Sequence, residues 1–234
     1  MNTPFQVFLL PGFDGTGELF TPLQSALDND ISTTVVRYQN EYMFEDYVDS
    51  VTSSLPPQNA VLIAESFSGP IAIALMARYP SRIKCAVLCT TFATSPFRLL
   101  TRAAQFVPRV FFGPNPTQSA ILRTFCFDKN SPSDIVEKAL SVIRSVPSHV
   151  IKSRLQVLSR LDMRPQLSQI KAPVLYLRAM QDRIVSVNLS QELIRGLPNV
   201  TEQIFDGPHL LLQSRANECA QTIIPFIKTN LSSE

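Results

Sequence analysis

A single serine lies in a setting that favours nucleophilic chemistry. Ser66 belongs to the stretch Ala64-Glu-Ser-Phe-Ser-Gly-Pro70, which follows an apolar run over residues 60–64 and precedes apolar residues at helical spacing. An apolar run of this length is typical of a buried strand. A serine on the sharp turn from a strand to a helix stands clear of the sheet, and small neighbours let the two elements approach closely. The layout predicts a nucleophile elbow, although Ala64 replaces the glycine of the usual pattern.

A serine hydroxyl becomes a good nucleophile only when a neighbouring base removes its proton. The chain has two histidines, His149 in a predicted helix and His209 in a turn after the last predicted strand. The chain order serine, acid, histidine is the one that accompanies a nucleophile elbow, and it favours His209 as the base. The acid should follow a strand that lies between the other two, where Asp182 is found. Asp206 is the alternative acid, weaker because it lies only three residues before the histidine.

Each of these residues also has an ordinary structural interpretation. The serine can sit unused in a strand–turn–helix unit, a single histidine is more often packed than catalytic, and Asp182 alone would be a surface turn residue. Their order, with each residue at the carboxyl end of a predicted strand, favours the catalytic interpretation.

Alternating strands and helices surround the three residues. Apolar runs predict buried strands at 6–10, 33–38, 60–64, 85–91, 173–179 and 201–205. Helical spacing predicts helices at 18–27, 44–55, 70–79, 188–197 and 210–231. Strands separated by crossover helices predict an α/β fold, with a mostly parallel sheet covered by helices on both faces. Ligands of such sheets bind beyond the carboxyl ends of the strands.

The alternation stops between residues 92 and 172. Helices are predicted there at 95–107, 117–125, 132–146 and 149–161, and the third of them begins with a capping box of Ser131 and Asp134. We therefore expect one domain over residues 1–234, with a core of 1–91 and 173–234. The helical lid of about 92–172 is inserted between strands four and five.

Composition excludes several classes of function. The 234 residues are 45% hydrophobic and 17% charged, as in a globular protein with one core. No apolar run approaches the roughly 20 residues of a membrane span, and no secretory signal is visible, so we expect a cytoplasmic protein. The four cysteines lack metal-ligand spacing and are predicted to be reduced, mostly buried thiols. The loop 11–17 departs from the dinucleotide fingerprint, and we expect neither cofactor nor metal.

These motifs together resemble the α/β-hydrolase superfamily over nearly the whole chain. The segments Leu10–Gly17 and Ala64–Pro70 are similar to those of small bacterial serine hydrolases. The resemblance implies a six-stranded sheet, with Ser66 as the nucleophile, His209 as general base and then acid, and Asp182 as the orienting carboxylate.

The resemblance also implies an oxyanion hole built from backbone N–H groups. The donors would be those of Phe67, the residue after the nucleophile, and of Phe13 in the first loop. Many relatives have His-Gly before the second donor, whereas this chain has Pro11-Gly12. The backbone role is unaffected, but the side-chain contact of such a histidine is lost.

Positive charge is concentrated in the predicted lid. Residues 92–172 hold twelve basic and four acidic side chains, a net charge of +8, whereas the rest holds nine basic and fifteen acidic, a net charge of −6. Such asymmetry can steer an anionic partner, although Lys- and Arg-rich helices are often simply solvated. The candidate docking residues for an acyl carrier are Lys138, Arg144, Lys152, Arg154 and Arg160.

Apolar side chains in the same region predict a pocket for an acyl chain. The candidates for substrate contact are Phe97, Phe106, Phe111, Phe112 and, outside the lid, Leu210. An apolar acyl group on an anionic carrier would suit both features, a combination that resembles the pimeloyl-[acyl-carrier protein] methyl ester esterases. An anionic membrane surface is an alternative partner. Nucleic acid is disfavoured, because no basic motif with interleaved aromatic residues is present.

The sequence therefore predicts a serine hydrolase of carboxylic esters or thioesters that forms an acyl-enzyme on Ser66. A carrier-linked substrate such as an acyl-carrier-protein methyl ester is included in this prediction. A small-molecule carboxylesterase and an acyltransferase are the alternatives of the same class. The alternative of another class is a ligand-binding protein that keeps the fold and the pocket without turnover.

Overall fold

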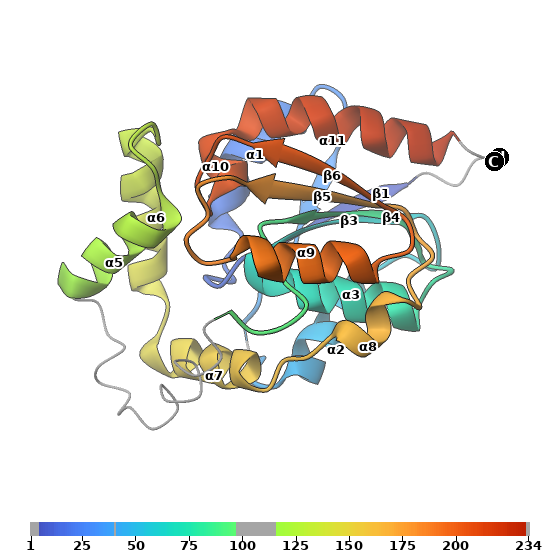
Figure 1. Cartoon of the computed structure of the whole chain (residues 1–234), viewed down its shortest axis with the longest axis horizontal. Coiled ribbons are helices and arrows are strands. Elements are labelled where there is room, and N and C mark those ends of the chain that lie inside the picture. Colours follow the sequence, from blue (N-terminus) through green and yellow to red (C-terminus); the bar gives the residue numbers. More distant parts are fainter. Residues whose placement is uncertain (1–4, 40, 97–115, 233–234) are drawn as a thin grey trace.

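One six-stranded sheet organises the computed structural model, which describes residues 5–39, 41–96 and 116–232 (Figure 1). The strand order is β2-β1-β3-β4-β5-β6, and all neighbouring strands are parallel. The predicted α/β fold class with a parallel sheet is confirmed. The strands are β1 Gln6–Leu10, β2 Thr33–Val35, β3 Ala60–Glu65, β4 Ile83–Cys89, β5 Val174–Ala179 and β6 Val200–Phe205.

The strand β2 is shorter than the predicted 33–38. Val36 N still donates to Leu9 O at 2.9 Å, but Tyr38 N donates to Gly15 O at 2.8 Å. The chain thus leaves the sheet to bond with the loop that follows β1. Tyr38 is held there rather than in a ladder with a neighbouring strand.

Helices cover both faces of the sheet, because the strand side chains alternate between two apolar cores. Val7, Leu9, Val61 and Ile63 belong to one core and Phe8, Leu10, Leu62 and Ala64 to the other. On the first face lie α1 Thr21–Leu27, α10 Leu211–Ser214 and α11 Ala216–Leu231 (Figure 1). On the other lie α2 Phe44–Ser54, α3 Gly69–Arg78, α8 Arg164–Leu167 and α9 Val187–Gly196.

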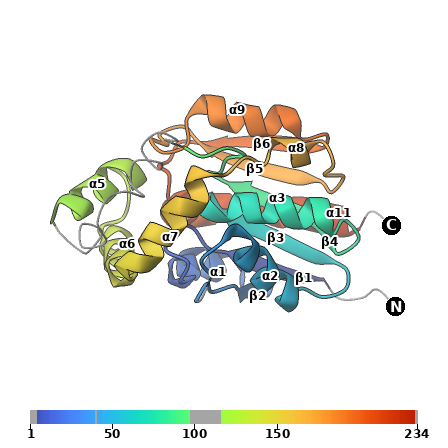
Figure 2. The same cartoon turned by 90° about the horizontal axis from the view of Figure 1, so that it is seen from below.

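Of the helices described between β4 and β5, three stand beyond the carboxyl ends of the strands (Figures 1 and 2). They are α5 Pro116–Cys126, α6 Ser133–Ser145 and α7 Ser148–Ser159. The helix predicted at 95–107 lies almost wholly outside the described residues. The predicted capping box of α6 is wrong, because its N-cap is Pro132 and Ser131 Oγ instead donates to Asp128 Oδ1 at 2.6 Å.

The four cysteines are free thiols in the structure, and the prediction that they are mostly buried is confirmed. Burial raises the pKa of Cys85, Cys126 and Cys219 to about 12, so these thiols carry no charge near neutral pH. Within the described ranges, no helix combines the length and apolar character needed to cross a bilayer.

Candidate active site

The structure brings the predicted serine, histidine and aspartate into one hydrogen-bonded chain. Ser66 Oγ lies 2.9 Å from His209 Nε2, and His209 Nδ1 lies 2.9 Å from Asp182 Oδ2. Because a carboxylate only accepts, Nδ1 is the donor to Asp182, which leaves Nε2 to accept the hydroxyl proton of Ser66. The side chains of His209 and Asp182 are 4% and 3% exposed, so the pair is shielded from water.

A strained backbone presents Ser66 at the end of β3. Ser66 has φ of 46°, in the left-handed region that a residue with a side chain rarely occupies. Thr91 Oγ1, just beyond β4, donates to Ser66 O at 2.5 Å. A Cβ on Gly69 would lie only 1.9 Å from that threonine oxygen. The absence of a side chain at Gly69 therefore allows Thr91 to approach closely enough to make its hydrogen bond to Ser66 O.

Asp182 is oriented by the turn after β5. Its Oδ1 accepts hydrogen bonds from the backbone N–H groups of Ile184 and Val185, both at 2.8 Å. Its other oxygen is thereby left to face His209. Asp206, the alternative acid, instead accepts a hydrogen bond from Gln181 Nε2 at 2.6 Å.

Opposing effects set the pKa of His209. Burial lowers this pKa, but the charge of Asp182, the hydrogen bond from Nδ1 and the charge of Glu65 together raise it above its usual value. A general base must be neutral to accept a proton. The arrangement can therefore activate Ser66 only at pH values above this raised pKa.

The loop after β1 is fastened to the elbow through Ser68. Ser68 Oγ donates to Pro11 O and lies 2.7 Å from Tyr38 Oη, which is consequently the donor in that second bond. The rings of Phe13 and Phe67 pack edge to face, with centroids 5.9 Å apart. The two residues expected to supply oxyanion donors are thus neighbours in the structure.

A second buried carboxyl, Glu65, lies directly before the serine and was missed at the level of sequence. Its Oε2 accepts from Gln213 Nε2 at 3.1 Å, whereas Oε1 is buried without a hydrogen-bond partner among the described residues. Burial raises the pKa of Glu65 to about 7; the charge of His209 lowers this pKa, and that of Asp14 raises it. The available signal was an acidic residue at the end of a strand predicted to be buried.

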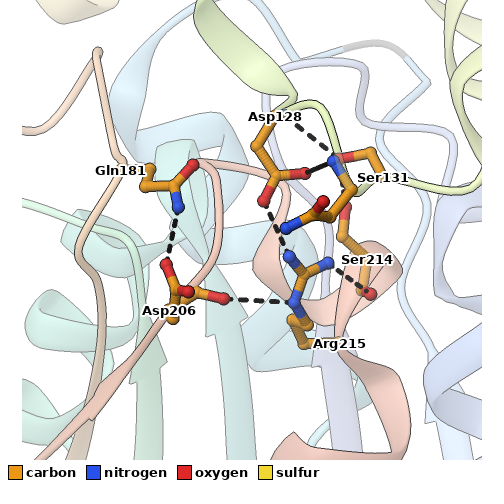
Figure 3. A network of polar contacts seen from close by, with 7 residues as sticks. Asp128, Ser131, Gln181, Asp206, Ser214 and Arg215 are labelled. Atoms are coloured by element: carbon orange, nitrogen blue, oxygen red, sulfur yellow. Dashed lines mark hydrogen bonds and ion pairs between the residues drawn. The ribbon is translucent and has the colours of Figure 1, made fainter.

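A polar network joins the segment after α5 to the two loops that carry the acid and the histidine (Figure 3). Arg215 Nη2 donates to Asp128 Oδ2 at 2.7 Å, and its Nε donates to Asp206 O at 3.1 Å. The side chains of Arg215 and Asp128 are 11% and 3% exposed. Asp206 Oδ1 also accepts a hydrogen bond from Gln181, next to the acid, so the ion pair and these hydrogen bonds together connect three separate parts of the chain.

The predicted substrate residues are only partly within the described chain. Leu210 is buried and packs with α6 and Leu19 in an apolar cluster, and its N–H donates to Cys126 O at 3.1 Å. It therefore lies between the histidine loop and the helices beyond the sheet. The other four candidates, Phe97, Phe106, Phe111 and Phe112, lie outside the described residues.

The predicted docking residues do not form one exposed group. Arg144, Arg160 and Lys138 are exposed, and Lys138 forms an ion pair with Glu18 at 2.8 Å. Lys152 is half-buried.

The prediction that Arg154 docks a carrier is wrong, because this residue is only 2% exposed and cannot contact a partner at the surface. Its guanidinium turns inward, to the backbone of the loop after β1.

No cluster of three or more His, Cys, Asp or Glu side chains suited to a metal ion occurs in the described part of the chain. The chemistry that the described groups can perform is proton transfer from Ser66 to His209 beside a buried carboxylate. This is the arrangement required for attack of a hydroxyl on a carbonyl carbon.

Known proteins resemble the chain in sequence. Residues 10–215 match the profile of a protein family described as alpha/beta hydrolase fold. The AB hydrolase superfamily protein YisY of Bacillus subtilis (strain 168) is 27% identical over 169 residues, which cover 68% of this chain and 62% of that protein. The chain thus matches less than two thirds of that relative's length.

Solved structures resemble the chain in fold. A hydrolase from Oleispira antarctica has a TM-score of 0.82 and 17% identity, covering 97% of this chain and 92% of its own. An enol-lactonase from Burkholderia xenovorans LB400 has a TM-score of 0.79 and 18% identity, with coverage of 97% and 92%. A thermophilic esterase from Thermogutta terrifontis has a TM-score of 0.82 and 16% identity, with coverage of 99% and 92%.

We predict that Glu65 makes the stability of the protein depend on pH. Its pKa is about 7 in the folded protein and near the usual 4.5 when unfolded, so between these values the folded state binds more protons. The free energy of unfolding therefore falls as pH rises from about 4.5 through 7, by about 3 kcal/mol for this group. Glu65→Gln removes this contribution while keeping an acceptor for Gln213. Urea unfolding of both proteins from pH 4.5 to 8 measures the difference, and parallel curves would contradict the prediction.

Proposed function

Because the chain belongs to the α/β-hydrolase fold family, we propose that it hydrolyses carboxylic esters or thioesters through an acyl-enzyme on Ser66. The observation that carries the proposal is the hydrogen-bonded chain from Ser66 through His209 to Asp182. The family and the esterase, lactonase and hydrolase folds that resemble this one support a hydrolase.

The first half of the reaction forms the acyl-enzyme. His209 Nε2 takes the hydroxyl proton as Ser66 Oγ bonds to the carbonyl carbon of the substrate, and the carbonyl oxygen becomes an oxyanion. The backbone N–H groups of Phe13 and Phe67 stabilise that oxyanion. The C–O or C–S bond of the substrate then breaks, and His209 gives its proton to the leaving alcohol or thiol.

The second half of the reaction releases the acid. His209 takes a proton from water as the water oxygen bonds to the acyl carbon, and the second tetrahedral intermediate expels Ser66 Oγ, which recovers its proton from His209. An acyltransferase would differ only in the nucleophile that replaces water. Asp182 stabilises the imidazolium in both halves through its bond to Nδ1.

A fluorophosphonate probe tests whether the serine is activated. We expect stoichiometric labelling of Ser66 in the wild-type protein, located by mass spectrometry of the modified peptide. Ser66→Ala should abolish labelling, and His209→Ala should slow it by orders of magnitude, because the base that activates the hydroxyl is gone. An unlabelled wild-type protein would favour the ligand-binding alternative and overturn the enzyme proposal.

The identity of the acid is tested by paired substitutions. Asp182→Asn should lower kcat by about 10⁴, because an amide does not hold the histidine in the required tautomer. Asp206→Asn is the matched control and should change kcat far less, since Asp206 bonds with Gln181 and not with the histidine. Circular dichroism establishes that both variants fold. The reverse result would assign the acid to Asp206.

A carrier-linked substrate is the finer proposal, and the net positive charge of residues 92–172 supports it. We expect kcat/KM to favour an acyl methyl ester on acyl-carrier protein over the free ester at low salt, with the preference shrinking as salt screens the charges. A triple variant of Lys138, Arg144 and Arg160 to alanine should lose that preference and keep the free-ester rate. Equal use of both esters at both salt concentrations would instead favour a small-molecule carboxylesterase.

A further inference from the structure

We propose that Arg154 of helix α7 positions the oxyanion hole by holding the two residues that supply its donors. The inference rests on the serine hydrolase function proposed above. It replaces the predicted docking role of this arginine at the surface with a role inside the protein. Arg154 acts through the backbone of Phe13 and the ring of Phe67, so it is a positioning residue.

The guanidinium is bonded to the loop that carries the first donor. Arg154 Nη1 donates to Phe13 O at 2.7 Å and to Asp14 O at 2.6 Å. These bonds fix the backbone immediately after the Phe13 N–H and so restrict the direction in which that N–H points. Nε of the same side chain donates to Tyr47 Oη on α2 at 3.3 Å, which gives the guanidinium a third hydrogen bond.

The same guanidinium also lies against the residue that carries the second donor. Its central carbon is 6.0 Å from the ring centroid of Phe67 and 6.0 Å from that of Tyr47, within reach of cation–π attraction. Phe67 in turn packs edge to face on Phe13. One side chain thus contacts both residues of the predicted oxyanion hole.

The loop is shaped around the guanidinium. Gly15 has φ of +69°, and a Cβ at this position would lie 2.2 Å from Arg154 Nη2. Within the same turn, Asp14 Oδ2 accepts hydrogen bonds from Thr16 N at 2.9 Å and Thr16 Oγ1 at 2.6 Å. Glycine is therefore required here both by the backbone angle and by the closeness of the arginine.

The hydrogen bonds of Arg154 favour a role in positioning the oxyanion hole over one that only attaches α7 to the core. In the described part of the chain they go to two carbonyl oxygens and a phenol, none of which neutralises the guanidinium. A positive charge kept beside the oxyanion donors favours the developing negative charge of the transition state. A residue that only attached α7 to the core would have no such effect on the reaction.

A comparison of an ester with its thionoester, in which C=S replaces C=O, distinguishes a misplaced oxyanion hole from a general loss of structure. An oxyanion gains more from hydrogen-bond donors than a thiolate anion does, so a misplaced hole slows the oxygen ester selectively. The probes are p-nitrophenyl butyrate and its thiono analogue, in which C=S replaces C=O. We expect Arg154→Met to lower kcat/KM for the oxygen ester by about ten- to a hundredfold. The thiono ester should slow by less than about threefold, and Arg154→Lys, which keeps the charge, should be intermediate.

Two further variants keep the test decisive. Arg195→Met removes an exposed arginine on α9 and is the control, expected to leave both rates unchanged. If Arg154→Met does not fold, Tyr47→Phe removes the hydroxyl that accepts from Arg154 Nε without altering the loop backbone, and it should produce a smaller loss of the same selectivity. Thermal melts accompany each variant, so that the rates compared are those of folded protein.

The outcomes distinguish this inference from the function on which it rests. Equal losses for the two esters in the folded Arg154 and Tyr47 variants, or no loss at all, would overturn the positioning role while the hydrolase proposal stands. A wild-type protein that hydrolyses neither ester and is not labelled at Ser66 would overturn both. Selective loss of the oxygen ester supports the positioning role.

Discussion

The bond between Ser66 Oγ and His209 Nε2 requires that segments far apart in the chain end at one place. A parallel sheet satisfies this requirement, because the carboxyl ends of its strands lie at a common edge. β3, β5 and β6 deliver the serine, the acid and the histidine, and β4 delivers the threonine that holds the turn. This arrangement requires a strained, left-handed backbone at Ser66. The close approach of Thr91 to Gly69 maintains that backbone conformation.

Two buried carboxyls near His209 differ in their surroundings. Asp182 accepts two backbone N–H bonds and the histidine N–H, whereas Glu65 accepts one bond from Gln213 and leaves Oε1 without a partner in the described part of the chain. Burial with few hydrogen bonds to the carboxyl favours the neutral acid. The raised pKa of Glu65 follows from this difference, and its ionisation feeds back on the pKa of His209.

The sheet could be predicted because each strand is an apolar run in the sequence. The candidate catalytic residues could be predicted because they occur in the order serine, acid, histidine, each after such a run. The serine, Asp182 and His209 each follow a recognisable strand, so topology alone brings them to one edge. Arg154 could not be interpreted in the same way. The sequence around it predicts a helix with several basic residues and does not distinguish Arg154 from the others. Its side chain points inward because of tertiary hydrogen bonds to the loop after β1. The early end of β2 likewise depends on contacts of Tyr38 that lie far away in sequence.

The burial of Arg154 has a consequence for the exchange of parts between related hydrolases. Insertions beyond the sheet are natural units to graft when a new specificity is wanted, and a graft over residues 92–172 would appear to leave the core intact. In this chain such a chimera would lose a side chain that completes the first loop of the core. A graft that ends before Ser148 retains α7 and its arginine. The boundary of the transferable unit is therefore set inside the helical region, and not at its junction with the sheet.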